Sequence, residues 1–148
     1  MTAKVAVEAV FEAPLAASFD AYWRLENWPI ALEDVVAVDV KYDDGQHQAF
    51  AMTVMRPRGE ETVGGVRFAY RPDRLELCQF APPPGFQFMS GLWSFTPIDA
   101  TRTRVRAERS FALLDPNEEA DRKAKIAVLL EHNLGAFKKL VQGGRNGQ

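Results

Sequence analysis

Residues 127–141, AVLLEHNLGAFKKLV, have the spacing of apolar side chains that is typical of an amphipathic α-helix. Asn133 lies in the middle of the apolar stripe of this predicted helix, three or four residues from apolar neighbours. A buried amide without a hydrogen-bond partner costs about 1–3 kcal/mol, so an asparagine at this place needs a reason. Either it bonds to a neighbouring backbone carbonyl, or it lines a cavity that admits a polar ligand. The apolar members of the stripe are Ile126, Leu129, Leu130, Ala136, Phe137 and Leu140.

The helix is predicted to begin at Asp115 and to end near Val141. Asp115 is a suitable N-cap, and acidic residues follow it in the first turn. Lys138 and Lys139 in the last turn suit the negative end of the helix dipole. The glycine-rich residues 142–148, QGGRNGQ, are predicted to form a disordered tail.

The sequence before this helix consists mostly of short runs with strand character. Residues 3–13 alternate apolar and polar side chains, as a half-buried strand does. Residues 15–23 and 26–35 are predicted to be helical, since Pro14 and Pro29 suit the first turn of a helix. Turn sequences such as DDG and RPD separate the remaining strand-like runs. These runs are residues 35–42, 48–55, 62–70, 74–80, 86–98 and 103–114.

This order of elements predicts an α+β fold with seven antiparallel strands that curl around the long helix. A sheet that does not close fully on the helix leaves a ligand cavity between them, and Asn133 would face it. No boundary between domains is visible, so residues 1–148 are predicted to form a single domain.

The composition excludes several classes of protein. A net charge of −2 gives no basis for nucleic-acid binding, and no apolar run approaches the ~18 residues that membrane insertion requires. The N-terminal segment alternates and contains glutamates, unlike a signal peptide, so a cytoplasmic location is expected. A lone Cys78 and two histidines, His47 and His132, predict neither a disulfide nor a metal site. No glycine motif for a nucleotide is present either.

Three motifs resemble those of the bacterial polyketide aromatase/cyclases. This family belongs to the helix-grip superfamily (SRPBCC), together with START domains and birch-pollen-allergen-like (Bet v 1-like) domains. The first motif, residues 13–29, is APLAASFDAYWRLENWP with its Trp28-Pro29 pair. The second, residues 82–111, is PPPGFQFMSGLWSFTPIDATRTRVRAERSF with Trp93 in the penultimate strand. The third, residues 132–140, is HNLGAFKKL, whose Asn133 matches a cavity-facing asparagine of the family.

The resemblance covers nearly the whole chain. It implies a helix-grip fold: a seven-stranded curved antiparallel sheet, two short helices and a long C-terminal helix over a ligand cavity. It further implies an enzyme of antibiotic biosynthesis that uses no cofactor. Such an enzyme binds a poly-β-ketone, or a related hydrophobic intermediate, and directs its aldol-type cyclisation with or without dehydration. The competing hypotheses are a non-catalytic carrier or sensor of a hydrophobic small molecule, and a protein-interaction module, because the fold alone does not separate them.

The resemblance also implies a cavity arginine in the strand over residues 62–70. Alignment from the downstream strand selects Arg67, and alignment of the RPD turn selects Arg71. An inward arginine would stabilise an enolate or polarise a carbonyl. The opposite face, which includes Tyr70, is the more apolar one, and if that face points inward both arginines are solvated.

Arg109 is a charge on the apolar face of the last predicted strand, which also carries Val105, Ala107 and Phe111. It either reaches water from the rim of the sheet or binds an oxyanion inside. The candidate catalytic residues are therefore Arg67, Arg71, Arg109 and Asn133.

The candidate substrate-binding residues are apolar or aromatic and otherwise belong to the core. Among Tyr22, Tyr42 and Tyr70 the sequence does not choose a phenol for proton transfer. Arg56 and Arg58, in a predicted turn, either contact an acidic acyl carrier protein or are simply solvated. The substrate-binding candidates are Trp28, Tyr70, Trp93, Phe95, Leu129, Leu130 and Phe137.

Overall fold

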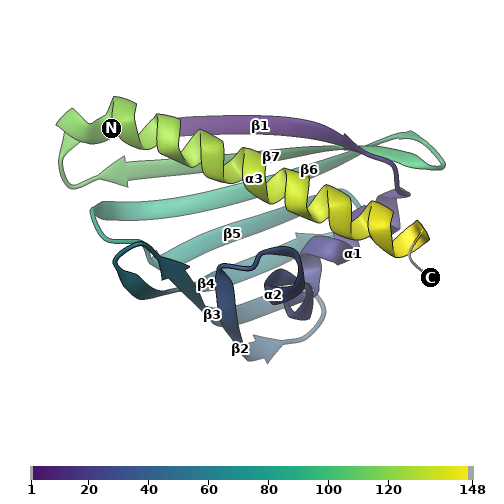
Figure 1. Cartoon of the computed structure of the whole chain (residues 1–148), viewed down its shortest axis with the longest axis horizontal. Helices are drawn as coiled ribbons and strands as arrows, with labels where there is room; N and C mark the ends of the chain where they lie inside the picture. Colours follow the sequence, from purple (N-terminus) through teal and green to yellow (C-terminus); the bar gives the residue numbers. More distant parts are fainter. Residues whose placement is uncertain (1, 147–148) are drawn as a thin grey trace.

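The computed structural model describes residues 2–146, without the side chains of residues 80, 81 and 144–146. A curved antiparallel sheet holds a long helix across its concave face, as the sequence predicts (Figure 1). The strands are β1 (Ala3–Phe11), β2 (Val35–Asp43), β3 (His47–Arg56), β4 (Gly59–Tyr70), β5 (Arg74–Ala81), β6 (Phe86–Asp99) and β7 (Arg102–Leu113). The helical elements are α1 (Leu15–Trp23), η1 (Leu25–Asn27), α2 (Trp28–Ala31), η2 (Pro116–Glu118) and α3 (Glu119–Asn146).

The strand order is β1-β7-β6-β5-β4-β3-β2, so β1 and β2 form the two edges of the sheet. Figure 1 shows α3 running obliquely across the sheet, with β1 at one edge and α2 near the other. The helix packs closely against β1 and β7 rather than against the middle strands. The concave surface of β3, β4 and β5 is therefore left for other side chains to cover, and this is where a cavity forms.

Two local signals at the ends of α3 can be compared with the sequence prediction. Asp115 caps η2, because its Oδ1 accepts a hydrogen bond from the backbone N–H of Asn117 (3.0 Å). The expected disordered tail from residue 142 is corrected, since α3 continues to Asn146. Each added helical residue gains a backbone hydrogen bond. The Oε1 of Gln142 also accepts from the backbone N–H of Glu12 (2.9 Å). Residues 147–148 lie outside the described residues.

The face of β4 that points inward was left open by the sequence. The structure buries Val63, Gly65, Arg67 and Ala69, so the arginine face is the concave one. Gly65 fits here because a Cβ at this position would stand 2.4 Å from the backbone oxygen of Cys78 on β5. The lack of a side chain thus brings β4 and β5 together at an irregular point of their pairing.

Aromatic rings fill the core between α1, α3 and the sheet. The ring of Tyr22 on α1 stacks on Phe137 of α3, with centroids 4.1 Å apart, and lies 5.5 Å from the ring of Trp93 on β6. Trp28 stands edge-on to Phe137 at 5.0 Å. This aromatic core fixes α1 and α3 against the sheet and closes one side of the cavity described below.

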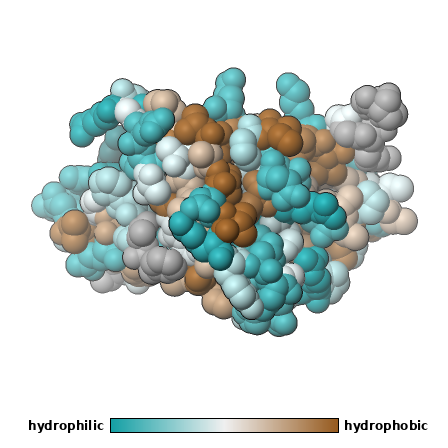
Figure 2. Space-filling view, turned by 90° about the horizontal axis from the view of Figure 1, so that it is seen from below, coloured by the Kyte–Doolittle hydropathy of each residue, from teal (hydrophilic) through white to brown (hydrophobic). Residues whose placement is uncertain are grey.

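The surface carries apolar side chains in places. Figure 2 views the side on which β2 and α2 lie and shows an apolar band between polar side chains. Exposed apolar side chains include Ile30 on α2 and Val128 and Leu129 on α3. Within residues 2–146, no helix combines the length and the apolar character that a membrane crossing requires.

Candidate functional site

A cavity of about 190 Å³ lies between α3, the η1–α2 segment and the concave face of the sheet. Its walls are mostly apolar, and its polar lining comes from only a few side chains. Asp34, Arg56, Pro83 and His132 line it and are exposed or partly exposed, which places them at the mouth. The apolar walls include Leu25, Trp28, Phe50, Met52, Leu77, Met89, Ile126 and Leu130.

Arg67 enters this cavity wall from β4 and is 1% exposed. Its Nε donates to Oε1 of Gln48 (2.8 Å), and its two Nη groups donate to the backbone oxygens of Tyr22 (2.8 Å) and Trp23 (2.7 Å). These oxygens are at the C-terminal end of α1, where the helix dipole is negative. Burial lowers the pKa of Arg67 to about 9, while the nearby Asp43 opposes this shift. Arg67 is therefore a cation that holds the end of α1.

Arg109 enters from β7 and also lines the cavity. Its Nη1 donates to the backbone oxygen of Glu108 (3.0 Å), and its guanidinium carbon lies 4.7 Å from the centre of the Trp93 ring. Burial lowers the pKa of Arg109 to about 10, with Tyr22 opposing the shift, so the group stays charged at neutral pH. Gly91 pairs with Arg109 across β6 and β7. A Cβ at Gly91 would stand 2.6 Å from Nη1, so the glycine makes room for the guanidinium.

Three buried polar atoms near these arginines make no hydrogen bond within the described residues: Oδ1 of Asn133, Nε1 of Trp93 and the hydroxyl of Tyr22. Asn133 and Trp93 line the cavity, and the Tyr22 ring packs against Trp93. Burial raises the pKa of Tyr22 well above its ordinary value, and the charge of Arg109 partly offsets this. Buried polar groups are usually hydrogen-bonded, so these three atoms are exceptions within the described residues. Of the three residues, only Asn133 and Trp93 belong to the cavity lining.

Comparison with solved structures identifies the fold. The Zhui aromatase/cyclase from Streptomyces sp. R1128 superposes with a TM-score of 0.86 at 15% identity, over 97% of this chain and 95% of that one. A START superfamily protein from Mycobacterium smegmatis gives 0.82 at 13% identity, over 94% and 97%. The chain has the helix-grip fold.

The same fold recurs in a two-domain protein. The di-domain ARO/CYC StfQ from the steffimycin biosynthetic pathway matches with a TM-score of 0.83 at 18% identity, over 100% of this chain and 53% of that one. The present chain thus spans about half the length of that protein. No protein-family model matches the sequence, and no curated protein does.

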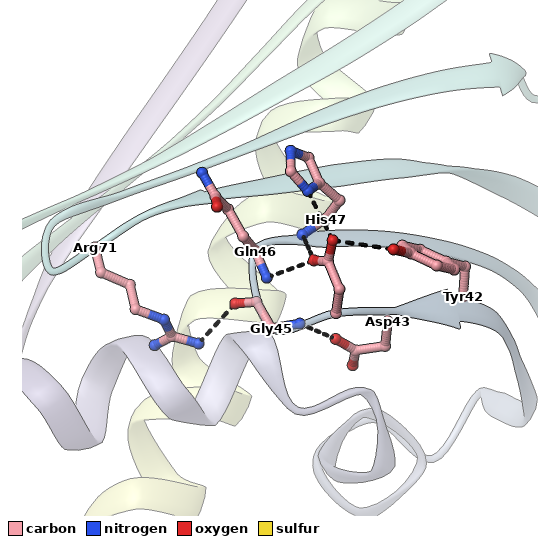
Figure 3. Close-up of polar contacts among 7 residues, drawn as sticks. Tyr42, Asp43, Gly45, Gln46, His47 and Arg71 are labelled. Carbon is pink, nitrogen blue, oxygen red and sulfur yellow. Dashed lines mark hydrogen bonds and ion pairs between the residues drawn. The ribbon is translucent and has the colours of Figure 1, made fainter.

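The helix-grip structure places the four predicted catalytic residues in two groups. Arg67, Arg109 and Asn133 all line the cavity. Arg71 does not, which corrects its selection as a cavity arginine. It follows the end of β4, where its Nη1 bonds to Oδ1 of Asp20 (3.2 Å) and its Nη2 to the backbone oxygen of Gly45 (3.4 Å). Figure 3 shows this side chain directed at the β2–β3 turn.

The predicted substrate-binding residues are divided in the same way. Tyr70 is 41% exposed, and the Arg74 guanidinium covers its ring at 4.3 Å, so its assignment to the cavity is corrected. Its side chain points away from the concave face because strand residues alternate. Phe95 and Phe137 belong to the aromatic core rather than to the cavity wall. The predicted residues that do line the cavity are Trp28, Trp93, Leu129 and Leu130.

The two predicted carrier-contact residues lie at the β3–β4 turn. Arg56 lines the mouth and forms ion pairs with Asp34 (3.9 Å) and Glu61 (3.7 Å). Arg58 is exposed at the same turn. Arg56 is thus at the entrance and already engaged by two carboxylates.

Sequence reasoning missed Gln48 and Gly91. Gln48 is 2% exposed and links Arg67 to the Oδ2 of Asp43 (3.1 Å). The available signal was a single polar residue on the buried face of β3, opposite Arg67 in the strand register. Gly91 was detectable only once its pairing with Arg109 was known. Within residues 2–146, no group of three or more histidine, cysteine or acidic side chains is arranged to hold a metal ion.

Proposed function

We propose that this protein is a cofactor-independent cyclase that binds a β-ketone chain in its cavity and directs an aldol-type ring closure, with dehydration where aromatisation follows. The observation that carries the proposal is the placement of Arg109 and Asn133 in one cavity whose walls are mostly apolar. Apolar walls suit a folded carbon chain, and the polar groups suit its oxygens. The shared fold with aromatase/cyclases supports this choice without deciding it.

The proposed reaction needs no net change in protons. A methylene between two carbonyls loses a proton to a water molecule and becomes an enolate. Its carbon attacks a distant ketone, forming the C–C bond and leaving an alkoxide, which takes up one proton. If the ring is to become aromatic, hydroxide then leaves with a neighbouring proton as water. Much of the acceleration would come from holding the enolate carbon near one particular carbonyl.

Each polar group has a proposed role in that sequence. Arg109 stabilises the negative charge of the enolate and the alkoxide, because it is a half-buried cation that lines the cavity. Asn133, which lines the cavity, orients a carbonyl of the substrate or a water molecule through its amide. Tyr22 is the phenol that lies closest to this chemistry, since Tyr42 and Tyr70 are exposed. Arg67 positions the end of α1, which supports Tyr22.

A carrier protein is the proposed source of the chain. Arg56 lies at the mouth and Arg58 is exposed at the same β3–β4 turn, where an acidic carrier domain or its phosphopantetheine phosphate would arrive. Replacement of Arg58 by Glu should then slow delivery from a carrier protein but leave the reaction of a free thioester unchanged. Equal losses with both substrates would contradict this assignment.

The test is a product assay with a reactive poly-β-ketone thioester on its carrier protein. Wild type should turn a mixture of spontaneous products into one main product. Asn133→Ala and Arg109→Ala should lose that control, while Arg71→Ala serves as the surface control and should retain it. Circular dichroism checks that each variant is folded. A wild-type product distribution equal to the protein-free reaction would refute the cyclase for that substrate class.

The alternative is a non-catalytic carrier or sensor of a hydrophobic small molecule. One observation favours it: among the described lining residues, the only carboxylate and the only imidazole are Asp34 and His132, both at the mouth. The cavity interior therefore holds no group with a pKa suited to general-base work. Mass spectrometry of a ligand that co-purifies unchanged, together with a negative product assay, would support this alternative.

A further inference from the structure

Arg67 and Arg109, the two lining arginines that are not at the mouth, differ in how their charges are compensated. Arg67 donates to two carbonyl oxygens at the negative end of α1 and, through Gln48, is linked to the carboxylate of Asp43. Asp43 raises the pKa of Arg67 against the effect of burial, as a nearby negative charge should. Three of its five N–H donors are used in these contacts. The charge of Arg67 is therefore largely compensated by groups of the protein.

Arg109 has no comparable compensation. Its hydrogen bond goes to one neutral backbone oxygen, and its other close contact is the face of Trp93. The carboxylate of the adjacent Glu108 points to the other side of the sheet, where it pairs with Lys4 (3.7 Å) and Arg106 (3.4 Å). Within residues 2–146, no carboxylate forms an ion pair with Arg109. Arg109 is half-buried and lines the cavity, so a ligand there can supply the negative partner that Arg109 lacks among the described residues.

The residues around Arg109 hold its guanidinium in a defined place. Gly91 leaves space beside the guanidinium, and Trp93 supports it from β6. Asn133 and Trp93 belong to the same lining, and Oδ1 of Asn133 and Nε1 of Trp93 make no hydrogen bond within the described residues. An anion bound to Arg109 would therefore lie beside further polar groups.

We infer that the cavity selects a small anionic ligand, a carboxylate or an ionised acidic enol of one or two rings, whose negative charge is bound by Arg109. The size follows from the cavity volume of about 190 Å³, which is below the ~300–1,000 Å³ of pockets for drug-sized ligands. The inference rests on the proposed function, because it names the charge and size of the ligand that the cyclase would bind.

The test measures the binding of 2-hydroxybenzoate and of 2-hydroxybenzamide at neutral pH by tryptophan fluorescence and by titration calorimetry. The two probes share size and hydroxyl position and differ in charge. We expect the carboxylate to bind about 10-fold more tightly, the value of a hydrogen bond to a charged group over a neutral one. Arg109→Met should abolish this preference, and Arg71→Gln, which changes a surface arginine, should retain it.

Gly91→Ala provides the sharper variant, because it keeps the charge and displaces it. Its Cβ would meet the end of a flexible side chain, so the fold should survive while Arg109 moves. The carboxylate preference should fall several-fold in this variant, which also carries the test if Arg109→Met does not fold. Equal binding of the two probes by wild type, no binding of the carboxylate at millimolar concentration, or a preference that persists in Arg109→Met would each overturn the inference.

The binding test and the product assay can fail independently of each other. A carboxylate preference without control over cyclisation would refute the cyclase and keep the anion site. Control over cyclisation without a carboxylate preference would keep the cyclase and refute the anion site.

Discussion

The hydrogen bond between Arg67 and Gln48 allows a quantitative prediction about the role of Arg67. The perturbation is a double-mutant cycle with Arg67→Met, Gln48→Leu and the combined variant. Both side chains are almost fully buried, and the bond from Nε to Oε1 is 2.8 Å long. The cycle isolates the energy of this contact from the other effects of each substitution.

The expected magnitude follows from counting the buried groups that lose every partner. Arg67→Met leaves Oε1 of Gln48 without a donor. The Tyr22 oxygen keeps Trp28 Nε1 (3.0 Å), and the Trp23 oxygen keeps Gln48 Nε2 (3.2 Å). Gln48→Leu likewise leaves only the Nε of Arg67 unpaired.

The combined variant again leaves only one such group, the Trp23 oxygen, which loses both side-chain donors. An unpaired buried group costs about 1–3 kcal/mol. The double variant should therefore be about 1–3 kcal/mol more stable than the sum of the single losses predicts.

Urea unfolding followed by far-UV circular dichroism and by tryptophan fluorescence gives the free energies of unfolding, and coincident curves justify two-state analysis. Additivity to within ~0.5 kcal/mol would refute the reasoning. Arg67 would then not be tied to Gln48, and it would be available to a ligand rather than reserved for positioning α1.

Three further outcomes are expected from the same structure. Gly65→Ala should lower the free energy of unfolding by about 2 kcal/mol or more, because the added Cβ meets the backbone of β5. Gly135→Ala, where the added Cβ meets open space, should raise it by up to ~1 kcal/mol. Equal effects of the two substitutions in urea unfolding would contradict the close contact between β4 and β5. Asn133→Leu should raise stability by about 1 kcal/mol, because an unpaired oxygen is removed, and should abolish product control; a thermal melt that shows a loss instead would mean that Asn133 is bonded in the native state. Hydrogen bonds from Thr101 and Arg102 lower the pKa of Asp99 to about 2. The stabilisation by the Asp99 carboxylate is therefore complete above the unfolded-state pKa of ~4 and is lost as the pH falls from ~4 through the folded-state pKa of about 2. Asp99→Asn should accordingly flatten the dependence of stability on pH in this acidic range, and an unchanged slope would show that Asp99 titrates normally.

The strand and helix order was accessible from sequence because each element carries its own local signal. Leu15–Trp23 is helical as the position of Pro14 predicts, and Asp115 caps the start of the last helical segment. Alternation also placed Arg109 on the buried face of β7, among apolar neighbours. Such signals act over a few residues, and they do not depend on which strands later become neighbours.

The choice between Arg67 and Arg71 could not be made from such local signals. The two are four residues apart and share a face in the strand pattern, yet Arg71 lies just past the end of β4. There it turns outward to Asp20 on α1 and to Gly45 at the β2–β3 turn. Its partners are 51 and 26 residues away in the chain, so no local pattern indicates them.

The sequence by itself determined the antiparallel strands, the long closing helix and the interruption of its apolar stripe by Asn133, because periodicity and turn chemistry are local. Only the tertiary structure decided which charges the protein satisfies internally. Arg67 is hydrogen-bonded to the end of α1 and to Gln48. Arg109 lies against the face of Trp93 beside Gly91 and forms no ion pair with a carboxylate of the described residues. The physical reason is that charge compensation depends on distances between strands and helices that meet only when the sheet curls around α3.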